Sequence, residues 1–273
     1  MTGFELSPPV FTILSALIEE RTGLHYGIDD RALLADKLAP RVVERGLDSL
    51  LDYYYFLRYD PGSEAEFARL VEALVVNETY FFRELPALEL VAQTFVPELI
   101  ARGTRPRIWC AASATGEEPL TLAMLLDGQG LLERVTLVAS DISARALAHA
   151  KEGRYFRRSL RALTPAAAER WFVPCEGGMQ IVPRIAKSVD FRRVNLVSPE
   201  EVAELGQFEI ILCRNVLIYF KDATVETVIA QLGNAIHPNG ILIVGASESL
   251  LRFDTAFVCE ERAGSFLYRK AVA

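Results

Sequence analysis

Apolar residues recur at helical spacing through the first part of the chain. They repeat every three to four positions between Val10 and Ile18, the spacing of one buried helix face. Similar patterns predict helices over residues 10–21, 30–45, 50–57 and 66–76. Pro40 should kink or divide the second of these helices. No strand pattern interrupts the series, so we predict a helical N-terminal domain over residues 1–76.

From residue 85 onward the pattern changes to alternating strands and helices. Short apolar runs predict strands at 105–110, 135–139, 189–194, 208–213, 241–245, 256–259 and 265–269. Helical patterns separate most of them, at 85–101, 120–126, 143–152, 163–172 and 222–236. This alternation is typical of a parallel α/β sheet. The last two strands have no helix between them, so the sheet should finish with an antiparallel hairpin.

The segment from Ile108 to Pro119 reads I-W-C-A-A-S-A-T-G-E-E-P and joins a predicted strand to a helix. Such a junction places backbone N–H groups and the positive end of a helix dipole at the carboxyl edge of a sheet, where α/β folds bind ligands. The segment has neither a P-loop lysine nor a G-x-G-x-x-G motif. Glu117 and Glu118 would repel a phosphate but suit hydroxyls, amines or a cationic ligand. Alternatively, both carboxylates only complement the helix dipole.

Composition and charge narrow the class of protein. Hydrophobic residues make up 51% of the 273 residues and charged residues 24%, values ordinary for a globular protein. The net charge of -7 argues against broad nucleic-acid binding. The four cysteines have no C-x-x-C spacing and the three histidines are scattered, so we expect no metal site and reduced thiols in a cytoplasmic protein. We see no signal peptide and no apolar run long enough to insert into a membrane.

Three further groups of residues have two interpretations each. Lys37, Arg41 and Arg45 recur every four residues, which suits either a solvated helix face or a docking surface for an acidic partner. The segment 77–84, N-E-T-Y-F-F-R-E, is either a linker that packs aromatics or part of a site. Asp141 ends the second predicted strand, where it either holds ribose hydroxyls or caps the next helix.

Taken together, five motifs resemble those of the CheR-type chemotaxis receptor methyltransferases, which use S-adenosylmethionine. The motifs are N-E-T-Y-F-F-R-E, A-A-S-A-T-G-E-E-P, A-S-D-I-S, C-R-N-V-L-I-Y-F and G-I-L-I-V-G-A-S-E-S, in this order. The resemblance implies an α/β fold in which a helical domain precedes a class I, Rossmann-like methyltransferase domain. It assigns 77–84 to a linker that contributes to the cofactor site and 85–273 to a mostly parallel seven-stranded domain. A small antiparallel β subdomain would be inserted at 171–187.

The same resemblance implies the roles of individual residues. Asn77, Thr79 and Arg83 would reach the methionine end and the methyl group of the cofactor. Glu117 would be the cofactor-binding carboxylate of the motif loop, and Asp141 would bind the ribose. Asn195 and Leu196 would flank the adenine, with Arg214 and Asn215 beneath the cofactor. Arg83 and Tyr219 would act at the methyl group, and Lys37, Arg41 and Arg45 would dock the receptor.

The implied activity is methyl transfer to glutamate side chains in the cytoplasmic domains of methyl-accepting chemoreceptors. A glutamate carboxylate is already ionised at neutral pH, so the reaction needs no general base. We expect a monomer, and the short inserted subdomain favours an enzyme that needs no receptor tether. Two alternatives remain: a non-catalytic CheR-like protein that senses S-adenosylmethionine, and a small-molecule methyltransferase.

Overall fold

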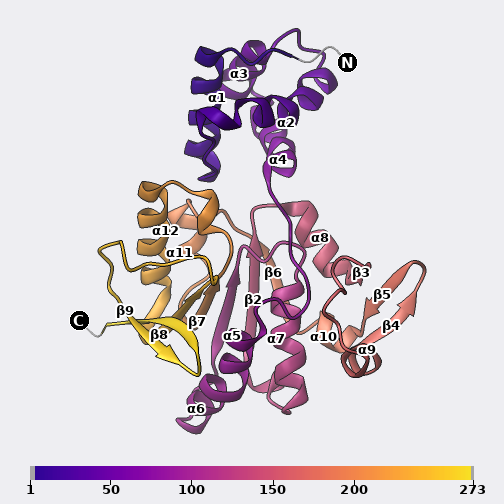
Figure 1. The fold of residues 1–273 in the computed structure, drawn as a ribbon, viewed down its shortest axis with the longest axis vertical. Helices are drawn as coiled ribbons and strands as arrows, with labels where there is room; N and C mark the ends of the chain where they lie inside the picture. The colour runs from indigo at the N-terminus through magenta and orange to yellow at the C-terminus, as the bar shows by residue number, and fades with distance from the viewer. Residues whose placement is uncertain (1–3, 272–273) are drawn as a thin grey trace. The chain divides into compact units, whose positions relative to one another are not determined.

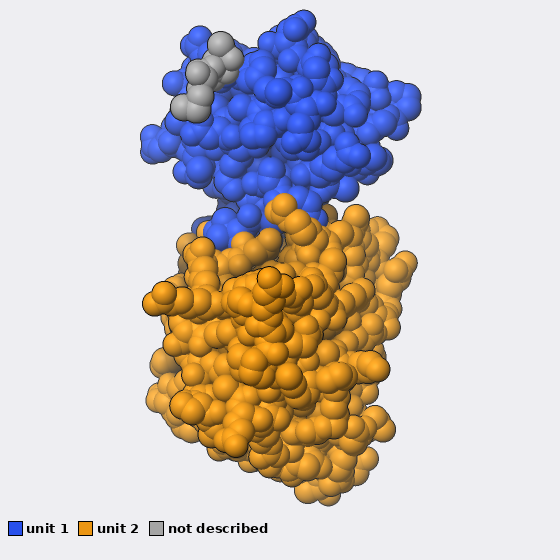
Figure 2. Space-filling model, turned by 90° about the vertical axis from the view of Figure 1, so that its right-hand side faces the viewer, with its two compact units in different colours: residues 1–76, 219–224 blue, residues 77–218, 225–273 orange. Residues whose placement is uncertain are grey.

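The computed structural model describes residues 4–271. The chain divides into two compact units, coloured separately in Figure 2. Unit 1 contains residues 1–76 together with 219–224, and unit 2 contains 77–218 and 225–273. The short second segment of unit 1 is held by the Leu24–Phe220 bridge and by a 2.9 Å hydrogen bond from the His25 N–H to the Tyr219 carbonyl.

Unit 1 is helical, as the apolar spacing predicts. Its helices are α1 (Pro8–Thr22), the short 3-10 helix η1 (Ile28–Asp30), α2 (Arg31–Glu44), α3 (Leu50–Tyr59) and α4 (Ser63–Leu74). Each buries apolar residues at helical spacing, for example Leu14, Leu17 and Ile18 of α1. Gly23 ends α1 in the left-handed conformation. The expectation that Pro40 divides α2 is wrong, because packing of the buried face of α2 outweighs one lost backbone hydrogen bond.

The expectation of an exposed basic face on α2 is also wrong for Arg41. Its guanidinium donates two hydrogen bonds of 2.9 Å to Glu66, whose side chain is only 1% exposed. The Tyr53 hydroxyl donates to the same carboxylate at 2.9 Å, and burial raises the pKa of this phenol. Lys37 Nζ donates to two carbonyls at the end of α4. The charge of Arg41 is therefore used inside the helical unit, where it satisfies a buried carboxylate.

Unit 2 is built on a seven-stranded sheet with the order β6-β2-β1-β7-β8-β10-β9. Its strands are β1 (Arg107–Ala111), β2 (Thr136–Asp141), β6 (Val189–Arg193), β7 (Phe208–Cys213), β8 (Ile236–Val244), β9 (Phe257–Arg262) and β10 (Ser265–Lys270). Strands β6, β2, β1, β7 and β8 pair in parallel, and β10 pairs antiparallel with both β8 and β9. The predicted parallel sheet and its final antiparallel hairpin are both confirmed.

Helices enclose this sheet and supply its core (Figure 1). They are α5 (Leu85–Leu90), a π-helical turn η2 (Val91–Phe95), α6 (Val96–Ala101), α7 (Glu117–Gly128), η3 (Leu132–Arg134), α8 (Ala144–Glu152), α11 (Pro199–Ala203), η4 (Leu217–Tyr219) and α12 (Asp222–Ala235). The central strands are buried on both faces, as in β7, where Ile210, Ile211 and Leu212 are fully buried. The core thus fixes the strands whose carboxyl ends carry the predicted site.

A second, three-stranded sheet stands beside the large one (Figure 1). It pairs β3 (Arg154–Tyr155), β5 (Gly178–Ile181) and β4 (Phe172–Cys175) antiparallel, flanked by α9 (Pro165–Trp171) and α10 (Pro183–Ala186). The predicted inserted hairpin is confirmed, but its third strand, β3, has only two residues and gave no sequence signal. Within residues 4–271, we find no helix of the length and apolar character needed to cross a bilayer.

Candidate functional site

The predicted ligand residues of unit 2 gather where four neighbouring parallel strands end. Strands β6, β2, β1 and β7 lie side by side, so their carboxyl ends form one continuous edge. The residues that follow or end these strands are Glu117, Asp141, Asn195, Leu196, Arg214 and Asn215. Tertiary structure therefore brings together residues that are up to about a hundred positions apart, and it does so at the edge where open α/β sheets bind ligands.

The loop between β1 and α7, residues 112–116, is called the ligand loop below and has a specific backbone shape. Ala112, Ala114 and Gly116 have positive φ angles of 53°, 46° and 90°. A side chain at Gly116 would lie 2.7 Å from the Ala150 side chain, so only glycine fits there. The loop is tied to the tip of β2 by 2.8 Å hydrogen bonds from the Ser113 N–H to the Ser140 carbonyl and from the Ala114 N–H to Asp141 Oδ2.

Asp141 is held rigidly at the end of β2. Besides the Ala114 N–H, its carboxylate accepts a 2.9 Å hydrogen bond from the Ser143 N–H. Ser143 itself caps α8, because its hydroxyl accepts the Ala146 N–H at 2.9 Å. The alternative that Asp141 is the helix cap is therefore wrong. The carboxylate instead links the ligand loop to β2 at the predicted ribose position.

Glu117 is a buried carboxylate with one unsatisfied oxygen. Its side chain is 1% exposed, and Oε2 accepts a 2.6 Å hydrogen bond from the Thr115 hydroxyl. Oε1 is buried and has no partner at hydrogen-bond geometry within residues 4–271, although the Ser159 hydroxyl lies near enough to lower the pKa of this carboxyl. Burial raises the pKa of the Glu117 carboxyl, and the Thr115 hydroxyl offsets part of this shift. An orphaned carboxylate oxygen at a ligand loop is chemically suited to accept hydrogen bonds from an ammonium group.

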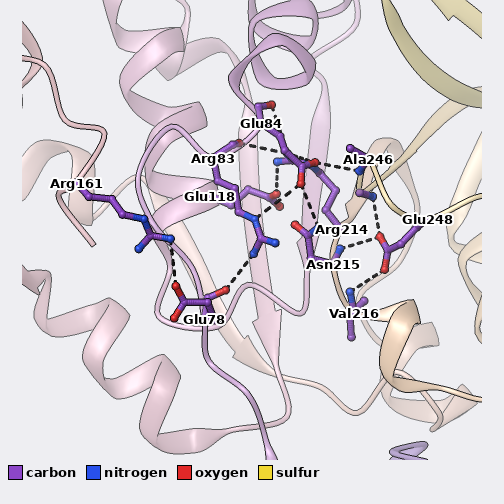
Figure 3. A network of polar contacts seen from close by, with 11 residues as sticks. Glu78, Arg83, Glu84, Glu118, Arg161, Arg214, Asn215, Val216, Ala246 and Glu248 are labelled. Atoms are coloured by element: carbon purple, nitrogen blue, oxygen red, sulfur yellow. Dashed lines mark hydrogen bonds and ion pairs between the residues drawn. The ribbon is translucent and has the colours of Figure 1, made fainter. Parts of the chain in front are cut away.

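Arg214, directly after β7, is the centre of a polar network (Figure 3). Its guanidinium donates to Glu118 Oε2 at 2.6 Å and to Glu84 Oε2 at 2.9 Å. It also donates to the backbone carbonyls of Arg83 and Glu84 at 3.2 and 3.3 Å. Burial lowers the pKa of Arg214, but the two carboxylates overcome it and the net shift is upward. A buried, permanently charged arginine thus fixes the backbone that carries Arg83.

Two further carboxylates complete this network. Glu84, whose φ is 47°, also accepts hydrogen bonds from the Asn215 amide at 3.2 Å and from the Ala246 N–H at 3.1 Å. Glu248 accepts four backbone N–H groups, from Gly245 and from Asn215, Val216 and Leu217, at 2.7 to 2.9 Å. The linker, the loop after β7 and the loop after β8 are therefore joined into one unit (Figure 3).

Sequence reasoning did not identify Glu84, Glu118 and Glu248 as members of this network. Glu118 was visible only as one of two carboxylates at a helix start, and Glu248 lies inside the motif G-I-L-I-V-G-A-S-E-S. A charged residue within an apolar strand-end motif is a signal that a buried partner is required. The partner itself, Arg214 or a row of backbone N–H groups, is not visible from the sequence.

The linker residues attach to unit 2 through their neighbours. Phe81 is fully buried and packs edge-on against Tyr155 with ring centroids 4.7 Å apart. The Phe82 N–H donates to the Thr121 hydroxyl at 3.1 Å, and Arg83 Nη1 donates to the Glu78 carbonyl at 3.0 Å. The aromatic residues therefore pack as the linker interpretation predicts. They leave the guanidinium of Arg83 partly exposed, at 28%.

The remaining predicted residues are placed as follows. Asn77 and Thr79 are half-buried in the linker. Asn195 accepts the Val197 N–H at 3.3 Å, and Leu196 is buried beside it. Tyr219 belongs to unit 1, whereas the residues at the sheet edge belong to unit 2. Its role at the methyl group stays a prediction.

Comparison with known proteins decides the family. Residues 77–264 match the family described as "CheR methyltransferase, SAM binding domain", and residues 10–75 match "CheR methyltransferase, all-alpha domain". The chain belongs to the CheR methyltransferase family.

Curated relatives span nearly the whole CheR chain. It is 35% identical over 257 residues to a chemotaxis protein methyltransferase of Vibrio anguillarum, covering 92% of both chains. It is 32% identical over 270 residues to chemotaxis protein methyltransferase 1 of Pseudomonas aeruginosa, covering 95% of this chain and 97% of the relative. The chemotaxis protein methyltransferase of Escherichia coli K12 is 32% identical over 258 residues, which cover 92% of this chain and 88% of that one. The CheR domain assigned to S-adenosylmethionine binding thus contains the whole strand edge described above.

Proposed function

We propose that this CheR protein transfers a methyl group from S-adenosylmethionine to glutamate side chains of methyl-accepting chemoreceptors, forming glutamyl methyl esters. The relatives are named as chemotaxis protein methyltransferases, and both CheR domains are present. The observation that carries the proposal is the position of Arg83. Its backbone is held by buried Arg214 beside the ligand loop, while its guanidinium stays partly exposed. That arrangement presents a rigidly placed cation to an incoming carboxylate.

The residues at the sheet edge fit the cofactor by their chemistry. The orphaned Glu117 oxygen suits the amino group of the methionine part, and Asp141 suits the ribose hydroxyls. Asn195 and Leu196 offer a polar and an apolar contact for the adenine. When bound, S-adenosylmethionine supplies a methyl group activated by a sulfonium.

Five more residues complete the proposed cofactor site. Asn77, Thr79 and Arg83 would line the methionine end from the linker, which Phe81 anchors in unit 2. Arg214 and Asn215 would support the site from beneath, because their side chains are fixed by Glu84 and Glu118. The network therefore acts through position rather than through proton transfer.

The protein's contribution to the reaction is alignment and exclusion of water. A glutamate nucleophile needs no deprotonation at neutral pH, since its ordinary pKa is ~4.3. Arg83 would orient the substrate or cofactor carboxylate with its planar fork, and Tyr219 would donate a hydrogen bond near the transferring methyl. Good positioning of two reactants is worth about 7–11 kcal/mol of barrier. The protein would work as a monomer in the cytoplasm.

A second candidate function is a non-catalytic sensor that binds S-adenosylmethionine or its demethylated product and reports it to a partner. The ligand loop alone would serve that role. Arg83 and Tyr219 favour the enzyme, because a sensor has no need for a cation and a phenol at the methyl group. A small-molecule methyltransferase is disfavoured by the all-alpha CheR domain at residues 10–75, which such an enzyme does not require.

Transfer of labelled methyl groups distinguishes these functions. The full chain is incubated with S-adenosylmethionine carrying a radiolabelled methyl group and with membranes that contain chemoreceptors, and the products are treated with mild alkali. We expect label on the receptor that is released as methanol, the behaviour of a carboxyl methyl ester. Tight cofactor binding without label on any receptor would instead support the sensor.

A further inference from the structure

The segment formed by β3 and the six residues after it has an unusual charge for this acidic protein. Residues 154–161 read R-Y-F-R-R-S-L-R, with four arginines and no acidic residue in eight positions. The whole chain has a net charge of -7, so this is a strong local reversal. The predicted functions do not use these arginines. Charge of this density is either a solvated face or a surface for an anionic partner.

The arginines converge on the linker that carries Arg83. Arg158 and Arg161 both pair with the carboxylate of Glu78, and Arg161 Nη2 lies 3.1 Å from Glu78 Oε1. Arg161 also stacks on Tyr80, with its guanidinium carbon 3.6 Å from the ring centroid. Figure 3 shows Arg161 and Arg83 reaching Glu78 from opposite sides. The basic segment therefore contacts Glu78, the residue whose carbonyl accepts a hydrogen bond from Arg83.

Glu78 neutralises only part of this charge. The Arg158 side chain is 79% exposed even though it is ion-paired. Arg157 is exposed, and we find no ion pair for it within residues 4–271. Arg158 and Arg161 thus share one carboxylate and Arg157 adds a third, exposed guanidinium, so the segment keeps an excess of positive charge. If the segment served only to hold the linker in place, the two arginines that bind Glu78 would be enough.

We propose that Arg157, Arg158 and Arg161 form a contact surface for the acidic segment of the receptor that presents the target glutamate. The inference rests on the proposed function, because only that function brings carboxylates to Arg83. This surface lies in unit 2 and is separate from the helical domain where we expected docking. Exposed complementary charges accelerate encounter and fix register more than they add affinity, which suits a substrate that must bind and leave.

The test uses the double variant R157Q/R158Q in the full chain, which removes two positive charges while Glu78 keeps its ion pair with Arg161. Arg102, which follows α6, provides the matched control R102Q, because it is 72% exposed and α6 lies away from β3 (Figure 1). For the double variant we expect the KM for receptor to rise about tenfold at low salt. Its kcat and its affinity for S-adenosylmethionine should stay within about twofold of wild type. The substitutions weaken receptor binding equally in the ground state and in the transition state, which raises KM and leaves kcat unchanged.

Salt and direct binding give two further readouts. The wild-type KM should rise with ionic strength, while that of the double variant should be nearly flat. Fluorescence anisotropy of a labelled receptor cytoplasmic fragment measures binding without catalysis. Weaker binding by R157Q/R158Q with normal binding by R102Q supports the surface even if no methyl is transferred. An unchanged KM and unchanged binding, or equal losses in R102Q, would overturn it. Absence of alkali-labile label with wild-type protein would count only against the methyl transfer.

Discussion

Arg214 and Glu118 form a buried ion pair, with Nη1 and Oε2 2.6 Å apart, across 96 residues of sequence. The side chain of Arg214 is 1% exposed and that of Glu118 is 15% exposed. Because the same guanidinium binds the carbonyls of Arg83 and Glu84, this pair sets the position of the linker backbone. Its integrity therefore concerns both stability and the proposed site.

Removing Arg214 alone should be costly. In Arg214→Leu the Glu118 carboxylate stays buried without its partner, which typically costs about 3–5 kcal/mol of unfolding free energy. The measurement is the denaturant midpoint of the purified protein. In the double variant Arg214→Leu with Glu118→Leu no uncompensated charge remains, so much of the loss should be recovered. A double variant as unstable as the single one would show that the ion pair is not the cause.

Glu248→Gln tests the carboxylate that gathers four backbone N–H groups. The glutamine amide keeps one oxygen acceptor, but its NH2 group replaces the other oxygen and cannot accept a hydrogen bond. Two of the four backbone N–H groups, such as those of Asn215 and Gly245, therefore lose their acceptor. We expect a loss of about 1–3 kcal/mol in unfolding free energy. Glu261→Gln is the matched control, because Glu261 is exposed at the end of β9. Equal midpoints for the two variants would contradict the structural role of Glu248.

Arg83 and Tyr219 should affect turnover more than cofactor affinity. Arg83→Ala and Tyr219→Phe each remove a proposed orienting group, and loss of one such donor at a reacting centre costs about 10²-fold in kcat. Cofactor affinity, measured by calorimetry, should fall much less. Arg83→Lys keeps the positive charge but not the planar guanidinium, so its kcat should lie between those of wild type and Arg83→Ala. Equal losses in kcat and in affinity would argue for a plain binding role.

Glu117 predicts a pH dependence of known sign. Because burial raises the pKa of this carboxyl above its ordinary value of 4.5, the folded protein holds the proton to a higher pH than the unfolded chain does. The contribution of protonated Glu117 to the free energy of unfolding is fully present below pH 4.5 and is lost as the pH rises through the pKa of Glu117 in the folded protein. Glu117→Gln removes this loss, so we expect the ligand-free variant to be more stable than wild type at neutral pH.

The same variant should bind S-adenosylmethionine more weakly, since an amide does not pair with an ammonium group. Denaturant midpoints of wild type and Glu117→Gln between pH 4.5 and neutrality test the first effect, and calorimetry tests the second. The difference between the two proteins isolates Glu117 from other groups that titrate in this range, including the neighbouring Glu118, whose pKa burial also raises. A variant that is less stable than wild type at neutral pH would refute the burial argument.

The sequence by itself determined the elements that depend on local pattern. Alternating apolar runs located the seven strands of the large sheet, and helical spacing located the helices of unit 1. The small-residue run between Cys110 and Gly116 marked the ligand loop, and at Gly116 the positive φ and the close approach of Ala150 require glycine. Ordered motifs then indicated the family, which the matches to both CheR domains confirm.

Only the tertiary structure decided what depends on partners far away in the chain. Arg41 looked like a surface residue by spacing, yet Glu66 on another helix draws it into the interior. Glu84 and Glu118 meet at Arg214 across about a hundred residues. Periodicity reports which face of an element is buried, whereas the choice between a solvated and a buried charge depends on whether the fold supplies a counter-charge to offset desolvation.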